Sequence, residues 1–259
     1  MGVINVTPDS FSDGGLYALT ESAICHAARL IEEGADMLDI GGESTRPGSA
    51  SVSADEELRR VIPVVQALAS RGIPVSVDTS KPEVMLAAIQ SGAVMINDVN
   101  ALRAAGAMEV VAAENVAACL MHMQGEPRSM QTNPRYRNDV VTDVKDFLRG
   151  RLSAAQEAGI PAKRLVIDPG FGFGKTLEHN LELLRHLDRF LDMGVAIMAG
   201  LSRKSMLGKI TGNDVGERIH ASVAAALLAA DRGAKILRVH DVKATRDAMA
   251  VYNAVNNGL

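Results

Sequence analysis

Short apolar runs recur along the whole chain, and most of them end on a polar side chain suited to chemistry. Stretches with apolar residues at helical spacing separate these runs. Strands that alternate with helices indicate a parallel α/β fold, and nearly unbroken Val, Ile, Leu and Met runs are typical of strands buried on both faces. We therefore predict a (β/α)8 TIM barrel, whose active site lies at the carboxyl ends of the strands. The eight runs are MGVIN, MLDIGGESTR, VSVD, VMIND, CLMHM, LVIDPG, AIMAGLSRK and ILRVH.

The stretches between the runs carry ordinary helix start and stop signals. The second has Asp55, Glu56 and Glu57 in its first turn, where acidic side chains suit the helix dipole, and it stops before Gly72. No linker interrupts the pattern, so residues 1–259 are predicted to form a single catalytic barrel domain. Because the first strand starts at Met1, we expect either an unusually bare first strand or a missing upstream segment. The expected helices cover residues 20–33, 54–70, 82–90, 107–114, 140–157, 177–191, 216–232 and 242–255.

Composition narrows the class of protein. The length of 259 residues matches one such barrel, and 47% hydrophobic residues suffice for a sizeable core. A net charge of −4 without a long basic run argues against a nucleic-acid partner. No apolar stretch is long enough to span a bilayer and no signal peptide is evident, so we expect a cytoplasmic protein without a membrane partner. The two cysteines, Cys25 and Cys119, are predicted to be buried free thiols.

The segments after the first two strands are rich in ligand groups. Residues 5–15 hold the amide of Asn5, two acids, three hydroxyls and Phe11, one of only five phenylalanines. The alternative is a solvated connector, but this composition favours a functional loop. Thr45 and Arg46 follow the second strand, and the guanidinium fork of arginine fits a phosphate or carboxylate. A surface salt bridge of Arg46 is the competing interpretation.

Three polar residues, Asp78, Asn97 and Asp168, stand at the ends of apolar strands. Buried carboxylates need hydrogen-bond donors or a counter-charge. A heterocycle that presents an amino group beside a ring N–H would supply such donors. The alternative is a set of structural ion pairs, yet three such positions together favour a ligand.

The last two strands are followed by cationic residues. Ser202-Arg203-Lys204-Ser205 follows the seventh strand, and Arg238 and His240 lie on one side of the eighth. Because barrel loops seven and eight often bind phosphate, we predict a diphosphate site here. His240 by itself would more often be structural, and His122 is assigned a structural role.

The glycine-rich segment from Asp168 to Thr176 fails as a nucleotide motif. Pro169 replaces the first glycine that a phosphate loop requires, and Lys175 replaces the last glycine of the dinucleotide fingerprint. We interpret the segment as a flexible loop that brings backbone and Phe173 to a ligand. The sequence has no zinc or EF-hand pattern. It is compatible with a Mg²⁺ ion, which binds through few protein ligands plus substrate phosphate oxygens, and Asn5 would suit that role.

Seven motifs together resemble the dihydropteroate synthase family over nearly the whole chain: NVTPDSFSDGG, ESTRPG, VDTSK, INDV, DPGFGFGK, GLSRKS and RVHDV. The resemblance implies a TIM-barrel transferase of folate biosynthesis, usually a homodimer and a sulfonamide target. It would join 6-hydroxymethyl-7,8-dihydropterin diphosphate to p-aminobenzoate and release diphosphate. Residues that usually precede the first strand in the family are absent here.

The resemblance also implies the role of each matching residue. Asp78, Lys204, Arg238 and His240 would be catalytic. The pterin would contact Asp78, Asn97, Asp168 and Lys204; diphosphate would contact Asn5, Thr45, Arg46, Arg238 and His240, with Mg²⁺ on Asn5; p-aminobenzoate or a sulfonamide would contact Phe11, Pro47, Phe173, Lys204 and Ser205.

The implied mechanism is a largely dissociative displacement of diphosphate, with the loops at residues 9–14 and 45–48 closing over it. A pterin-dependent methyltransferase would share the pterin carboxylates but would not need the diphosphate set. A non-catalytic pterin-binding paralogue should show a broken loop motif, and none is found. A phosphate-binding barrel of sugar metabolism is disfavoured by the carboxylate-rich interior. Helices at 216–232 and 242–255 are the candidate dimer interface.

Overall fold

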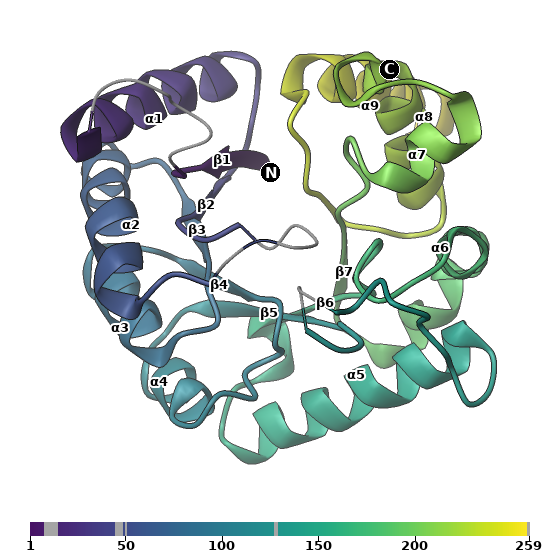
Figure 1. Ribbon diagram of the computed structural model, residues 1–259, viewed down its shortest axis with the longest axis horizontal. Coiled ribbons are helices and arrows are strands. Elements are labelled where there is room, and N and C mark those ends of the chain that lie inside the picture. The colour runs from purple at the N-terminus through teal and green to yellow at the C-terminus, as the bar shows by residue number, and fades with distance from the viewer. Residues whose placement is uncertain (8–14, 45–48, 50, 127–128, 258–259) are drawn as a thin grey trace.

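The computed structural model confirms the predicted barrel, with eight parallel strands that follow one another around the sheet in chain order (Figure 1). It describes residues 1–7, 15–44, 49, 51–126 and 129–257. Each predicted run overlaps a strand, so the apolar pattern located all eight, although β5 begins two residues before its run. The strands are β1 Gly2–Asn5, β2 Leu38–Gly41, β3 Val75–Asp78, β4 Met95–Asp98, β5 Ala117–Met121, β6 Leu165–Asp168, β7 Ala196–Ala199 and β8 Ile236–Leu237.

The two ends of the sheet meet between β1 and the segment that follows β8. Gly2 and Val239 form a parallel bridge, and the Val3 amide donates to the Val239 carbonyl at 3.0 Å. The Val239 amide in turn donates to the Met1 carbonyl at 3.0 Å. Hydrogen bonding therefore continues past the short strand β8 and closes the barrel.

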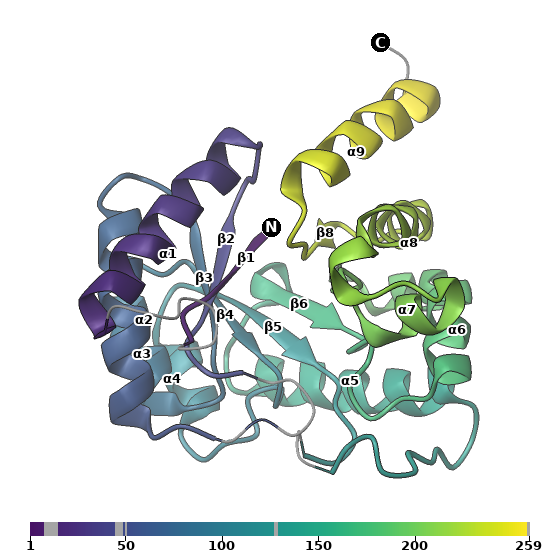
Figure 2. The ribbon, with the colours of Figure 1, turned by 45° about the horizontal axis from the view of Figure 1, so that its top comes forward.

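Helices follow the strands and surround them, with α1 to α4 on one flank and α6 to α9 on the other (Figure 2). Two helices begin at side-chain caps, where Ser53 accepts from the Glu56 amide and Asp139 accepts from the Thr142 amide. The helices are α1 Gly15–Glu32, α2 Ala54–Ala69, α3 Pro82–Gln90, α4 Ala107–Ala113, α5 Val140–Glu157, α6 Leu177–Arg185, α7 Ser205–Thr211, α8 Ile219–Asp231 and α9 Val242–Asn257.

Three expectations about the helices were wrong. The helix expected at residues 177–191 ends at Arg185, and a separate 3-10 helix covers Leu187–Met193. The set of eight helices omitted the seven-residue α7, which is too short to show a helical period. The first helix begins at Gly15, earlier than predicted.

The alternation of side chains along the strands separates two cores. Outward-facing residues such as Ile40, Ile96 and Ile167 pack under the helices in the main hydrophobic core. Inside the barrel, Met95, Cys119, Val166 and Met198 form a second, smaller cluster. The next inward positions along β4 and β6 are Asn97 and Asp168. Polar groups therefore lie above this apolar cluster, at the carboxyl ends of the strands.

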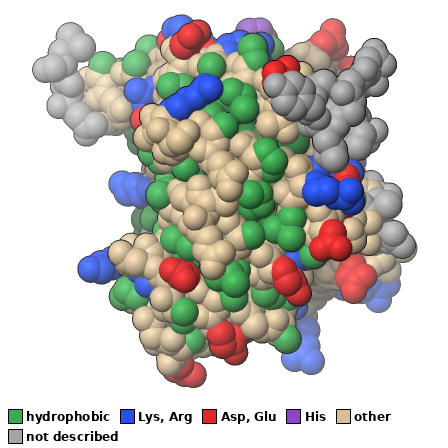
Figure 3. All heavy atoms as spheres, turned by 90° about the vertical axis from the view of Figure 1, so that its left-hand side faces the viewer, with side chains coloured by type: hydrophobic (Ala, Val, Ile, Leu, Met, Phe, Trp, Pro, Cys, Tyr) green, Lys and Arg blue, Asp and Glu red, His purple; other side chains and the backbone are tan. Residues whose placement is uncertain are grey.

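The outer surface carries interspersed charges. On the side formed by α1 to α3, acidic, basic and hydrophobic side chains are mixed (Figure 3). Among the helices that the structure describes, none is both long and apolar enough to cross a membrane. Cys119 is buried as predicted, whereas Cys25 is exposed, so that half of the thiol prediction was wrong.

Candidate active site

Arg238 lies inside the barrel mouth between two carboxylates. Its Nε is 2.5 Å from Asp39 Oδ2, and its Nη2 is 2.8 Å from Asp78 Oδ2. The Asn97 amide donates to the same Asp39 oxygen at 3.0 Å. Three predicted residues, Asp78, Asn97 and Arg238, thus lie together. The residue that links Asn97 to Arg238 is Asp39, which was not predicted.

Asp39 is fully buried, and its Oδ1 has no hydrogen-bond partner among the described residues. It was missed because only residues at the ends of the apolar runs were considered. The signal was present in the run MLDIGG: an acid two positions before Gly41 shares the inward face with it. A carboxylate inside an otherwise apolar strand needs a partner, and here that partner comes from β8's end.

The charges in this cluster perturb one another. Burial raises the pKa of Asp78 to about 7, although the Arg238 guanidinium opposes the shift; Asp39 adds to it. Burial lowers the pKa of Arg238, but Asp39 and Asp78 outweigh it and raise that pKa above the usual value. Arg238 therefore stays charged, while Asp78 changes its charge near neutral pH.

Asp168 ends β6 with its carboxylate buried, and its Oδ1 accepts from the Gly170 amide at 2.7 Å. Burial raises its pKa, against the effect of that hydrogen bond and of Lys204 and Arg238. The neighbouring strand continues into Gly200, where an added Cβ would stand 3.9 Å from Asp168 Oδ2. The absence of a side chain there leaves space beside the carboxylate.

Asn5 ends β1 and is paired in register with Gly41 of β2, which is in turn paired with Asp78. A Cβ on Gly41 would stand 3.9 Å from the Asn5 side-chain oxygen and from Asp78 Oδ2. Gly41 therefore keeps the space between these two polar groups free of a side chain.

The loop after β6 is packed rather than flexible, which corrects the expectation for this segment. Gly170 has φ +72°, and a Cβ there would lie 1.9 Å from the His122 carbonyl oxygen. At Gly174, with φ +64°, a Cβ would lie 2.4 Å from the Gln124 carbonyl oxygen. The glycines let this loop lie against the segment after β5. It brings the Phe173 ring to 4.2 Å from the Lys204 ammonium, a cation–π contact between two predicted residues.

Beneath that loop, Lys175 is buried against His122. Its ammonium lies 2.9 Å from His122 Nδ1 and donates to the Phe173 carbonyl at 3.0 Å. Burial and the Lys175 charge lower the pKa of His122 to about 2, so its ring is neutral and can accept from Lys175. The ring packs edge-on against Phe147. This arrangement fits the structural role predicted for His122.

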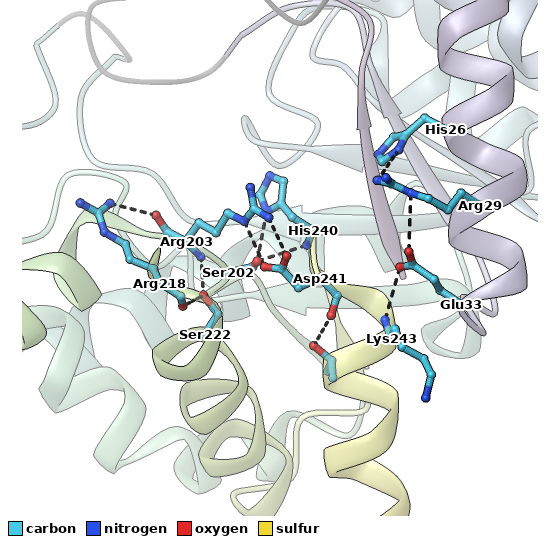
Figure 4. A network of polar contacts seen from close by, with 11 residues as sticks. His26, Arg29, Glu33, Ser202, Arg203, Arg218, Ser222, His240, Asp241 and Lys243 are labelled. Atoms are coloured by element: carbon cyan, nitrogen blue, oxygen red, sulfur yellow. Dashed lines mark hydrogen bonds and ion pairs between the residues drawn. The ribbon is translucent and has the colours of Figure 1, made fainter. Parts of the chain in front are cut away.

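The loop after β7 meets the end of β8 in a polar network (Figure 4). Ser202 Oγ accepts from the His240 amide at 3.1 Å and lies 3.1 Å from His240 Nδ1. Burial, Arg238 and Arg203 lower the pKa of His240 to about 4. Ser205 is exposed at the first position of α7, directly after Lys204. Phe11, Thr45, Arg46 and Pro47 lie outside the described residues.

A cavity of about 580 Å³ opens beside this centre, between the segments that follow β2 to β5. Asp78 lies in its wall, together with Asn100 and Arg103, which sequence reasoning did not single out. Asn100 follows β4 within a turn that Asp98 caps, since the Asp98 carboxylate accepts from the Asn100 and Leu102 amides at 2.7 Å. In the described part of the chain, no cluster of three His, Cys, Asp or Glu side chains could hold a metal ion.

Comparisons with known proteins identify relatives along the whole chain. The profile of the pterin binding enzyme family matches residues 1–240. Dihydropteroate synthase of Neisseria meningitidis serogroup C is 50% identical over 264 residues, which span 100% of this chain and 93% of the relative. Xanthomonas albilineans dihydropteroate synthase solved with 4-aminobenzoic acid has 55% identity and a TM-score of 0.93, over 99% of this chain and 92% of that one. The complex of the Xanthomonas enzyme with 7,8-dihydropteroate gives 49% identity and a TM-score of 0.88, over 99% and 92% of the two chains.

Proposed function

The chain belongs to the pterin-binding enzyme family, among the dihydropteroate synthases of folate biosynthesis, and on this premise we propose how its residues perform the reaction. The substrates are 6-hydroxymethyl-7,8-dihydropterin diphosphate and p-aminobenzoate, and the products are 7,8-dihydropteroate and diphosphate. The relatives solved with 4-aminobenzoic acid and with 7,8-dihydropteroate support this pair of substrate and product.

One observation carries the proposal: acceptors for a pterin and cations for its leaving group lie at the same end of the barrel. Asp78, Asn97 and Asp168 offer the acceptors, and their neighbouring glycines leave space for a flat ring. Lys204 and Arg238 supply positive charge that also acts on Asp168. A purely structural set of ion pairs would not require open space beside the carboxylates.

We assign the pterin to Asp78, Asn97, Asp168 and Lys204. The Asp168 carboxylate, whose Oδ1 is already fixed by the Gly170 amide, accepts from the pterin amino group and ring N–H. Phe173 and Lys204, already in contact with each other, hold the p-aminobenzoate ring. Ser205, at the start of α7, receives its carboxylate. Phe11 and Pro47 complete this pocket in the proposal, in line with the family resemblance.

We assign the diphosphate to Arg238, His240, Thr45 and Arg46, and to Asn5 through Mg²⁺. The donor set fits Mg²⁺, which binds through few protein ligands and fills its remaining positions with water and phosphate oxygens. The Asn5 side-chain oxygen faces the open space beside Gly41, in keeping with this role. When bound, Mg²⁺ would supply positive charge to the departing diphosphate.

The chain's own residues then act by charge and by position. Arg238 remains cationic at every working pH, so it stabilises negative charge that develops on the leaving group. The electron-rich pterin stabilises the methylene carbon as the diphosphate departs. Phe173 and Lys204 hold the arylamine in line with that carbon, which lowers the entropic cost of the displacement. No side chain serves as a covalent nucleophile in this scheme. Sulfonamides would compete for the p-aminobenzoate pocket.

We further propose that residues 1–259 act as one catalytic domain, in a cytoplasmic homodimer. The family resemblance supports the dimer. Exposed apolar side chains on α8 and α9, Leu228, Val251 and Val255, are compatible with an interface on these helices.

The experiment that tests the function is diphosphate release from the pterin diphosphate, p-aminobenzoate and Mg²⁺, with dihydropteroate identified by mass. We expect turnover that collapses in Arg238→Ala and in a metal-chelated sample. Arg149→Ala is the matched control, because that arginine is exposed on α5 and, within the described residues, pairs with Asp146 alone. Pterin binding without any turnover would overturn the proposal in favour of a non-catalytic pterin-binding protein.

A further inference from the structure

Ser202 lies against His240 through two contacts with a single oxygen. The His240 backbone amide donates to Ser202 Oγ at 3.1 Å, and the His240 ring nitrogen Nδ1 lies 3.1 Å from the same oxygen. Ser202 is almost fully buried, so water is not an easy partner for its hydroxyl proton. Figure 4 shows Ser202 beside His240 at the junction of the two segments.

The position of each proton follows from hydrogen-bond accounting. The Ser202 oxygen already accepts from a backbone amide, and its O–H needs an acceptor. Within the described part of the chain, Nδ1 is the acceptor hydrogen-bonded to it. If Nδ1 carried the ring proton, the Ser202 oxygen could accept from it, but the buried hydroxyl proton would then have no acceptor among the described residues. The arrangement is satisfied when Nδ1 is unprotonated and the proton is on Nε2.

We propose that Ser202 is a positioning residue that fixes His240 as the neutral Nε2–H tautomer, so that His240 serves the diphosphate as an oriented hydrogen-bond donor. The role in diphosphate binding rests on the function proposed above. The neutral state agrees with the lowered pKa of His240, which burial and the neighbouring arginines cause. On this view His240 orients the leaving group, and the positive charge comes from Arg238.

The position of Ser202 is itself fixed by the residue that follows it, Arg203, which has an unusual backbone conformation and several bonds to its surroundings. Arg203 has φ +56°, a left-handed conformation that a non-glycine residue adopts only when its surroundings impose it. Its amide donates to Ser222 Oγ at 2.9 Å, and its carbonyl accepts from Arg218 Nη1 at 3.2 Å. Its guanidinium binds both carboxylate oxygens of Asp241 at 2.6 and 3.0 Å.

These bonds tie both partners of the Ser202–His240 contact to one framework. Asp241 directly follows His240, and Arg203 directly follows Ser202, so their ion pair holds the two backbones side by side. The left-handed conformation of Arg203 fixes the course of the backbone here, and with it the direction of the Ser202 side chain. Such redundancy is expected where a side chain must hold another in a single orientation.

The test uses the whole protein and reads the ring protons directly. Nitrogen-15 spectra of the histidine side chains, with His240 assigned from His240→Gln, should show a protonated Nε2 and an unprotonated, hydrogen-bonded Nδ1. In Ser202→Ala we expect the Nδ1 resonance to move, because its donor is lost. Ser202→Thr keeps the hydroxyl and should restore the wild-type signal. A protonated Nδ1 in the wild type, or an Nδ1 resonance that Ser202→Ala leaves unchanged, would overturn the proposal.

A binding measurement then tests the consequence for the diphosphate. With inorganic diphosphate and Mg²⁺ as the probe, we expect Ser202→Ala to bind about 2- to 10-fold more weakly, as the loss of one oriented neutral hydrogen bond predicts. Thr245→Val is the matched control, since it removes a buried hydroxyl that bonds the Asp241 carbonyl and not the His240 ring. It should leave both the tautomer and the affinity unchanged.

The two readouts separate this inference from the function on which it rests. An altered Nδ1 signal with unchanged diphosphate affinity would overturn the role of Ser202 in anion binding. An intact tautomer in a wild-type protein without turnover would count against the proposed function instead. The wild-type spectrum is decisive for the tautomer even if Ser202→Ala does not fold.

Discussion

Arg238 and Asp39, 199 positions apart in the sequence, lie 2.5 Å apart inside the barrel. Asp39 is fully buried, while the Arg238 side chain keeps 21% of its surface exposed. The arginine therefore has two functions in our proposal: it neutralises the carboxylates Asp39 and Asp78, and it offers its remaining exposed surface to the diphosphate. Asp39 belongs to the site although no substrate needs to touch it.

We predict that Asp39→Ala destabilises the fold by about 1–3 kcal/mol, because Arg238 and the Asn97 amide lose a buried acceptor while Arg238 keeps its pair with Asp78. The free energy of unfolding in urea measures this. The control is Asp247→Ala, which breaks the exposed pair with Lys243 and should cost less than about 1 kcal/mol. Equal costs for the two variants would show that the Asp39–Arg238 pair has no stabilising role.

The second prediction concerns the pH dependence of pterin binding. Burial raises the pKa of Asp78 from 3.8 to about 7, so this carboxyl gains its charge near neutral pH. The ionised form accepts the pterin N–H groups, so kcat/KM for the pterin diphosphate should rise as pH passes through about 7. The effect on folding stability has the opposite sign. The folded state holds the Asp78 proton more tightly than the unfolded state, so the protonated carboxyl contributes stability below about pH 4. This stability is lost as the pH rises through about 7.

Asp78→Asn should lower kcat/KM at least about tenfold and remove this rise, since the side-chain amide of asparagine cannot ionise. The measurement is a pH profile between 6 and 8 at saturating p-aminobenzoate. A rise near pH 7 that persists in Asp78→Asn would assign the titration to another group, for instance Asp98, whose pKa burial raises to about 6.

The strands could be predicted well from the sequence because a parallel strand buried on both faces is a continuous run of apolar residues. The sequence also predicted the convergence of Asp78, Asn97 and Arg238 because strand ends in a barrel meet at one rim. It missed Asp39, although the run MLDIGG places this acid on the inward face; its partner Arg238 comes from the other end of the chain. No local pattern carries that pairing.

Helix boundaries failed for a different reason. A helical period over residues 177–191 does not show that backbone hydrogen bonding changes after Arg185, where the turns tighten into the 3-10 helix Leu187–Met193. The glycine loop was misread in a related way. Its glycines predicted freedom of movement, whereas in the fold they permit close contact between Gly170 and the His122 carbonyl.

That contact gives the third prediction, a comparison of two glycines with nearly the same φ. Gly170 and Gly194 have φ of +72° and +71°, but a Cβ meets the His122 carbonyl oxygen at the first and nothing within 4 Å at the second. Gly194→Ala should cost about 1 kcal/mol of stability, the strain of a left-handed alanine. Gly170→Ala should cost clearly more and abolish p-aminobenzoate turnover, because Phe173 is displaced. Similar unfolding free energies for the two variants would contradict the packed loop.

The last prediction concerns Lys175, which lies under the same loop with 3% of its surface exposed. Burial lowers its pKa from 10.5 to about 7; Asp168 opposes the shift and Lys204 adds to it. The folded state therefore binds fewer protons than the unfolded state between these values, so stability falls as pH drops from about 10 to about 7. Lys175→Met should remove this slope, while the exposed Lys235→Met should keep it.

Urea unfolding at pH 7.5 and 9.5 tests the slope as a difference between variants. We expect the wild type to gain about 2 kcal/mol relative to Lys175→Met over this range, since each pH unit inside the window contributes at most about 1.4 kcal/mol. The variant also loses the bond to the Phe173 carbonyl, so its KM for p-aminobenzoate should rise more than its KM for the pterin diphosphate. A wild-type protein with no such gain would mean that Lys175 keeps its proton in the fold. It would then be a buried cation that holds the loop through its bonds to the His122 ring and the Phe173 carbonyl.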